Sequence, residues 1–163
     1  MTFSTVDLTP EQREELHRIS EQRIKTFRYE KPELHGKPKR IEALVYGRES
    51  KELNVLVQIV GDGGENNMHY HTNSETAWMV LRGHARFHGV NGVLAELGPM
   101  QGIFLPGGCR YWFEKVGEGD LEILQMVGLE GTDDDERINV EAHKAWMVGD
   151  SELTKYEETA SSK

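Results

Sequence analysis

The feature that most restricts the fold of this chain is a series of short apolar segments, rich in Val, Ile, Leu and aromatic residues, that begins near residue 40 and is divided by glycines. Such segments, bounded by turn residues, are typical of β-strands. The sequence predicts eight strands, at residues 41–46, 53–60, 76–81, 85–90, 93–97, 102–105, 110–116 and 121–128. Asn91-Gly92 predicts a hairpin, because a type I′ turn needs positive φ at both central residues. The close spacing of the strands favours an all-β sandwich or barrel.

One α-helix is predicted before the strands. Thr9 stands where an N-cap would, Pro10 suits the first helical position, and Gln12 completes the spacing of a capping box. Apolar residues including Ile19 and Phe27 then fall near one helical face. We therefore expect this helix to lie across a sheet.

The 163 residues predict a single domain of ordinary size. We divide it into an N-terminal helix with its connecting loop (1–39), a barrel (40–130), and a C-terminal extension (131–163) that packs on the barrel and frays at its end. The acidic run at 133–136 is expected to be a solvated loop.

Charge and composition restrict the partners. The net charge of −9 repels nucleic-acid phosphates, so no nucleic-acid partner is expected. No apolar stretch approaches the roughly 20 residues that cross a bilayer, so no membrane partner is expected either. Cys109 is the only cysteine, which excludes an internal disulfide and favours a cytoplasmic location.

The candidate chemistry lies in the stretch from Gly63 to Glu75, which contains His69-Tyr70-His71. Residues two apart on a strand point to the same face, so His69 and His71 direct their imidazoles into one volume. Two imidazoles with a nearby carboxylate suit a divalent transition metal. Further ligands must come from other strands, because an extended segment cannot surround an ion.

This stretch resembles the first motif of the cupin superfamily, which is a glycine, five residues, His-x-His, three or four residues, a glutamate, six residues and a glycine. Gly63, His69 and His71 match it, and Glu75 follows His71 after three residues. The resemblance implies that Glu75 is a metal ligand.

The closing glycine of the motif leaves two alternatives for Glu75. Gly83 comes one residue later than the pattern expects. Counted back from Gly83, Thr76 takes the place of the glutamate and Glu75 points to the opposite face. A β-bulge or a flexible loop before the strand would return Glu75 to the site.

The second cupin motif is only partly present. Pro106 and Gly108 match its Pro-x-Gly, but Tyr111 stands at the histidine position and Lys115 at the asparagine position. Tyr111 is therefore predicted either to replace the histidine as a metal ligand, through a phenolate oxygen, or to act catalytically as a proton donor.

The resemblance covers residues 41–128 and implies the cupin double-stranded β-helix, a jelly-roll barrel. It implies one metal ion, with iron first and then manganese, nickel, zinc or copper. The cavity is expected to be lined by Trp78 and Phe113, with Arg86 holding a substrate carboxylate. Cupins of this kind commonly form homodimers, often by exchange of N-terminal segments.

Three functions follow from the resemblance. The first is a metal-dependent enzyme acting on a small organic carboxylate or aromatic molecule, as a dioxygenase or as a lyase or isomerase. The second is a non-catalytic module that binds a small ligand. The third is a metal-free sugar-type isomerase or epimerase, in which His71 and Tyr111 exchange protons.

Overall fold

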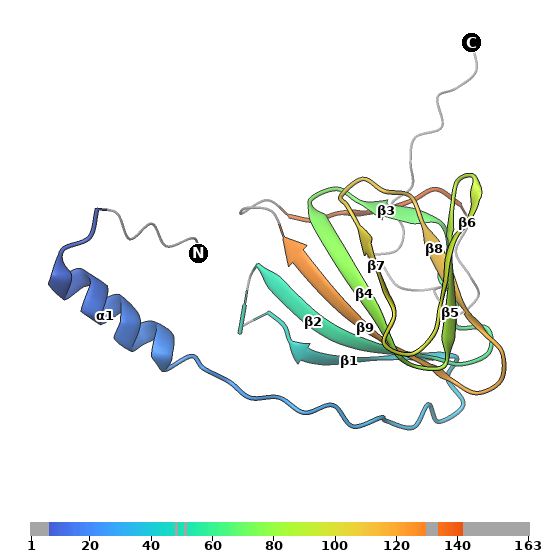
Figure 1. Ribbon diagram of the computed structural model, residues 1–163, viewed down its shortest axis with the longest axis horizontal. Coiled ribbons are helices and arrows are strands. Elements are labelled where there is room, and N and C mark those ends of the chain that lie inside the picture. Colours follow the sequence, from blue (N-terminus) through green and yellow to red (C-terminus); the bar gives the residue numbers. More distant parts are fainter. Residues whose placement is uncertain (1–6, 48, 51, 130–133, 142–163) are drawn as a thin grey trace, which may run out of the picture.

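The computed structural model describes residues 7–47, 49–50, 52–129 and 134–141, in which it forms one helix and ten strands (Figure 1). These elements are α1 (Pro10–Glu21), β1 (Lys39–Val45), β2 (Leu53–Val60), β3 (His69–His71), β4 (Ser74–Arg82), β5 (His84–Gly89), β6 (Gly92–Leu97), β7 (Gly102–Leu105), β8 (Trp112–Val116), β9 (Leu121–Leu129) and β10 (Arg137–Asn139). All eight predicted strands are present. β3 and β10 were not among them, because three residues each are too short to show a pattern.

The strands form three antiparallel sheets. The largest has the order β1-β2-β9-β4-β7, a second has the order β6-β5-β8, and β10 pairs with β3 in a short ribbon. Figure 1 shows the two larger sheets facing each other, with β3 across one end of the space between them. The all-β jelly-roll prediction is confirmed.

An aromatic cluster fills the space between the two larger sheets. Phe87 and Phe113 have no exposed surface, and their rings stack with centroids 5.1 Å apart. The Trp78 ring lies 5.0 Å from Phe113, and Tyr111 lies 6.4 Å from Phe87. These side chains come from β4, β5 and β8 and from the residue before β8, so burying their apolar surface joins the two sheets.

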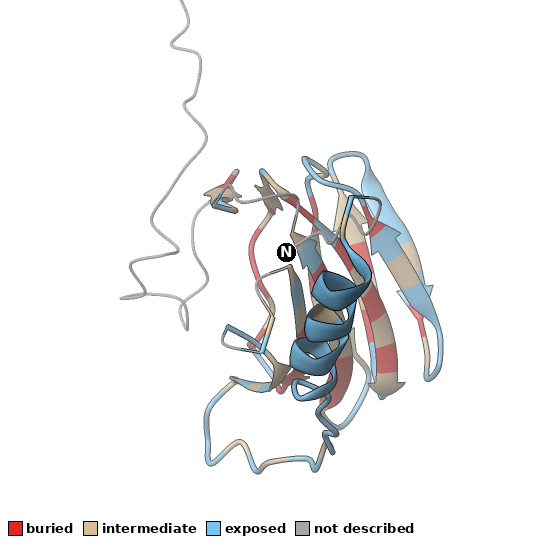
Figure 2. Cartoon of the chain, turned by 90° about the vertical axis from the view of Figure 1, so that its left-hand side faces the viewer, coloured by how far each residue is buried: buried red, intermediate tan, exposed pale blue. Residues whose placement is uncertain are grey.

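Helix α1 forms as its capping residues predict, but it does not lie on a sheet. The Thr9 hydroxyl accepts from the Gln12 amide at 3.3 Å, and the Gln12 side chain accepts from the Thr9 amide at 2.8 Å. None of its residues is buried (Figure 2). Ile19, for example, is 46% exposed. No helix in the described part of the chain is long and apolar enough to span a membrane.

The extended segment after α1, rather than the helix, contacts the sheet. The Tyr29 hydroxyl donates to Glu122 Oε2 of β9 at 2.8 Å, and Lys31 pairs with Asp120 at 2.8 Å. The expectation that the helix covers a sheet is therefore wrong, since none of its residues is buried and these contacts come from the segment that follows it.

Gly83, the closing glycine of the first motif, is required by both conformation and space. Its φ is +80°, and a Cβ there would lie 2.8 Å from the Asp120 carbonyl oxygen. Gly83→Ala is expected to lower the free energy of unfolding by roughly 2–4 kcal/mol, from the left-handed conformation and the backbone clash together. Urea denaturation of the two proteins measures this difference in the free energy of unfolding.

Gly63, the opening glycine of the same motif, supplies the control. Its φ is +75°, but a Cβ there would meet nothing within 4 Å. Gly63→Ala should therefore show only the conformational cost, about 1 kcal/mol. Equal losses in the two variants would mean that the close approach to Asp120 has no energetic role.

Candidate functional site

The site is built on the ribbon of β3 and β10. In its register Arg137 pairs with His71 and Asn139 with His69. Directly paired residues of antiparallel strands share a face, so these four side chains lie on one side of the ribbon. The His69 and His71 rings are 5.3 Å apart and inclined at 80°. The structure thus brings the two predicted histidines together.

Both imidazoles are held at the same ring nitrogen. His69 Nδ1 lies 2.8 Å from the Asn67 carbonyl oxygen, and His71 Nδ1 lies 2.7 Å from Asp135 Oδ2. A carbonyl and a carboxylate only accept hydrogen bonds, so Nδ1–H donates in each ring, and in the neutral form of the ring Nε2 carries the lone pair. Histidine ligands of metals are oriented in this way by a second hydrogen bond.

The carboxylate beside the histidines is that of Asp135 rather than Glu75, and it bonds His71 Nδ1 instead of being placed as a metal ligand. Besides His71, it accepts from the Asn73 amide at 2.9 Å and from the Ser74 hydroxyl at 3.0 Å. Burial alone raises the pKa of Asp135, but its hydrogen bonds, with that from His71 the largest, bring the pKa below its ordinary value. The expectation of a solvated loop at 133–136 is wrong for this residue. Residue 133 lies outside the described residues.

His69 is buried, with 3% of its surface exposed. Burial lowers its pKa well below the ordinary histidine value, and the positive charge of Arg137 lowers it further. The His69 imidazole is therefore neutral, which is the state that binds a metal or accepts a proton at Nε2.

Tyr111 lies next to His69, which belongs to the strand β3 that also pairs with β10. It forms a backbone bridge with His69, whose ring centroid lies 4.6 Å from the Tyr111 ring. The Tyr111 side chain is buried, and burial raises its pKa far above the usual tyrosine value. The group next to His69 is thus a neutral phenol that can donate its proton in a hydrogen bond.

Glu75 does not belong to this cluster. Its neighbours Ser74 and Thr76 are buried on the inner face of β4, whereas Glu75 is exposed on the outer face. Strand β4 does contain a register shift, between Val80 and Arg82, but it follows Glu75 and so does not turn it inward. The count back from Gly83 gave the correct face.

The three residues predicted to bind substrate do not lie together in the structure. Trp78 and Phe113 face the interior as expected and form its aromatic wall. Arg86 lies on the outside of β5, where it pairs with Glu96 at 2.6 Å and Glu114 at 3.4 Å. The prediction for Arg86 is wrong, because strand alternation turns it away from the buried Phe87 next to it.

Two cationic side chains that the sequence did not single out point into the same region. Arg137 donates to Asn67 Oδ1 at 2.6 Å and to Asn139 Oδ1. Lys39 Nζ lies 5.3 Å above the centre of the Phe113 ring. The spacing of residues along the sequence does not indicate that Lys39 or Arg137 lies near the histidines, because both come close to them only through strand pairing.

The donor set fits a metal only in part. In the described residues no group of three or more His, Cys, Asp or Glu side chains is placed to hold an ion. The atoms available to an ion are Nε2 of His69 and Nε2 of His71, and the Tyr111 ring lies beside them, with its centroid 4.6 Å from that of His69. A metal bound there would keep open positions for water or for an organic ligand.

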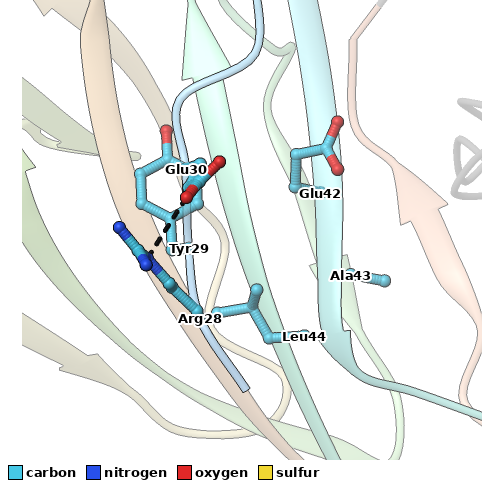
Figure 3. Close-up of a pocket in the computed structure, with 6 residues that line it drawn as sticks. All are labelled: Arg28, Tyr29, Glu30, Glu42, Ala43 and Leu44. Atoms are coloured by element: carbon cyan, nitrogen blue, oxygen red, sulfur yellow. Dashed lines mark ion pairs between the residues drawn. The ribbon is translucent and has the colours of Figure 1, made fainter.

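Two surface hollows lie away from these residues. One, of about 340 Å³, separates residues 28–30 from the strand residues 42–44 (Figure 3). Another, of about 300 Å³, is bordered by His84, Glu96 and Val116 among others. Neither is lined by His69, His71 or Tyr111, so neither belongs to the histidine site on the β3–β10 ribbon.

Known proteins resemble the chain in fold. The family model for the cupin domain matches residues 56–127. An uncharacterized protein with a double-stranded β-helix domain from Klebsiella pneumoniae superposes with a TM-score of 0.54 and 19% identity, over 66% of this chain and 83% of that one. An RmlC-like cupin from Desulfovibrio desulfuricans gives 0.54 and 17%, over 64% and 96%.

The DMSP lyase DddQ from Ruegeria pomeroyi gives a TM-score of 0.50 and 19% identity, over 60% of this chain and 50% of that one. At these identities the likeness shows the fold alone. Among the curated proteins none matches the chain.

Proposed function

The chain belongs to the cupin superfamily, and from this we propose that it binds one divalent transition metal ion through His69 and His71 and uses the site on a small organic molecule. The observation that carries the proposal is the anchoring of both Nδ1 atoms, at 2.8 Å and 2.7 Å from oxygen acceptors. In their neutral form the two rings then present oriented Nε2 lone pairs on one face of β3. Iron is the first candidate, followed by manganese, nickel, zinc and copper.

The metal would supply a Lewis acid that polarises ligand oxygens, or with iron a redox centre. The protein residues have separate tasks. Asp135 fixes the orientation of His71, and Tyr111 offers its phenol proton beside His69. Trp78 and Phe113 keep water from the inner end. These tasks suit a lyase, an isomerase or a dioxygenase.

A metal-free acid–base site is the second candidate. It is favoured by the absence, in the described residues, of a third His, Cys, Asp or Glu side chain placed with the pair. In that case Nε2 of a neutral histidine accepts a proton and the Tyr111 phenol donates one. The same groups could also hold a ligand without turnover.

Metal content measured by elemental analysis tests the proposal. After purification and reconstitution, the wild-type chain should hold close to one metal ion, and the His69→Ala/His71→Ala variant should hold none. His84→Ala/His88→Ala is the matched control, because it also removes two histidines, but from strand β5. There His84 borders the second surface hollow and His88 pairs with Glu114. This control should keep its metal.

The proposal fails if the reconstituted wild type holds no metal, or if the His69→Ala/His71→Ala variant keeps it. The first outcome would favour the acid–base site. A metal-loaded wild type would next be tested for oxygen uptake and for product formation with small aromatic and carboxylate substrates, which separates catalysis from binding.

A further inference from the structure

The segment 134–141 lies along the strand that carries the two histidines. Its central strand β10 has β3 as its neighbour in the ribbon. At one end of the ribbon the Thr72 amide donates to the Glu136 carbonyl at 3.1 Å. At the other end the Val140 amide donates to the Met68 carbonyl at 2.9 Å. Main-chain hydrogen bonds therefore attach the segment on both sides of the histidine pair.

Two side chains of the residues that follow β3 add to this attachment. The Thr72 hydroxyl accepts from the Glu136 amide at 3.0 Å. The Asn73 side chain donates to the Asp134 carbonyl at 2.9 Å. Neither bond involves a histidine, so both can be removed by substitution without changing the histidine pair.

Hydrogen bonds rather than apolar packing hold the segment in place. Among residues 134–141, the one buried side chain is that of Asn139, which is polar. The core cluster around Phe87 and Phe113 lies instead between the two larger sheets. A two-stranded ribbon is at best marginally stable by itself. The segment should therefore open locally, at a lower free energy than that needed to unfold the barrel.

The same segment brings Asp135 to the site. Its carboxylate holds the His71 ring through the 2.7 Å contact at Nδ1, and this bond is lost whenever the segment opens. Loss of such a partner of a histidine ligand typically lowers metal affinity by roughly 10–100-fold. The affinity of the histidine pair for a metal thus depends on whether the segment is docked on β3.

We propose that docking of the segment 134–141 regulates the histidine site: a metal ion binds tightly to His69 and His71 while the segment is docked, and the bound ion keeps the segment docked. The inference rests on the proposed function, and it names a regulation of that same site. Coupling of this kind is reciprocal. Saturating metal should therefore reduce opening of the segment by the same factor by which opening weakens metal binding.

Hydrogen exchange of the full chain, measured by mass spectrometry with Zn²⁺ and after chelation, tests the proposal. Peptides that contain the Thr72 and Val140 amides report docking, because these amides donate across the ribbon. Saturating Zn²⁺ should slow their exchange by roughly 10–100-fold in the wild type. In the His69→Ala/His71→Ala variant Zn²⁺ should leave their exchange unchanged.

Two further variants separate the coupling from docking itself. Asp135→Ala should bind Zn²⁺ roughly 10–100-fold more weakly, and saturating Zn²⁺ should no longer slow exchange of its segment. Thr72→Val/Asn73→Ala weakens docking but keeps the bond between Asp135 and His71. Its segment should exchange faster than the wild type without metal and should still be slowed by Zn²⁺. Glu75→Ala, an exposed change on the outer face of β4, is the control and should match the wild type in both respects.

Elemental analysis of the same samples separates this inference from the proposed function. A wild type that holds Zn²⁺ at the histidines, but whose segment exchanges as fast as in the metal-free protein, would overturn the inference and leave the metal site in place. Slowing by Zn²⁺ that persists in Asp135→Ala or in the His69→Ala/His71→Ala variant would overturn the inference as well. A wild type that holds no Zn²⁺ would refute both the metal site and its regulation.

Discussion

Replacing Phe113 by alanine is expected to lower the free energy of unfolding by about 3–5 kcal/mol. The side chain has no exposed surface, and its ring lies 5.1 Å from Phe87 and 5.0 Å from Trp78. Trp78 belongs to one large sheet, and Phe87 and Phe113 to the other. The truncation therefore removes contacts that join the two sheets and leaves a cavity that the rigid strands cannot close. Urea denaturation followed by far-UV circular dichroism measures the loss.

Phe104→Ala is the matched control for this prediction. Phe104 is 59% exposed on the edge strand β7, where it pairs with Ala77. Its truncation should change the free energy of unfolding by no more than about 0.5 kcal/mol, as for other exposed positions. A loss in Phe113→Ala as small as that in Phe104→Ala would contradict the assignment of the aromatic cluster as the core.

The stability of the metal-free protein is expected to fall as the pH decreases below about 6.5, in part because of His69. The folded-state pKa of His69 is lowered, first by burial and then by Arg137. Below the unfolded-state pKa, the unfolded chain therefore takes up a proton that the folded chain does not. This contribution to stability is complete above pH 6.5 and decreases by up to about 1.4 kcal/mol per pH unit, the value for one proton.

The pH effect is measured by urea denaturation of chelator-treated protein between pH 7.5 and 5. The His69→Asn variant should show a shallower slope than the wild type, by close to one proton. His84→Asn, at an exposed position of β5, should keep the wild-type slope. Parallel slopes in wild type and His69→Asn would show that His69 is protonated in the folded state.

The sequence by itself determined the strands and one face of the site. Strand formation depends on alternation and on turn residues such as Asn91-Gly92, which act over a few positions. The placement of His69 and His71 on a common side is a property of any extended segment. For the same local reason the capping box of α1 was predicted correctly from Thr9 and Gln12. The homodimer, the cytoplasmic location and the three-part division of the chain stay predictions.

Only the tertiary structure decided which groups surround the histidines. Asp135 contacts His71 across 64 residues of sequence, and Arg137 reaches Asn67 across 70. Those contacts depend on the pairing of β3 with β10, two strands too short to be predicted. The register of β4 likewise sets Glu75 outside, since a shift of one residue reverses the face of every side chain. Pairing partner and register are settled by the burial of the whole barrel, and no local pattern carries that information.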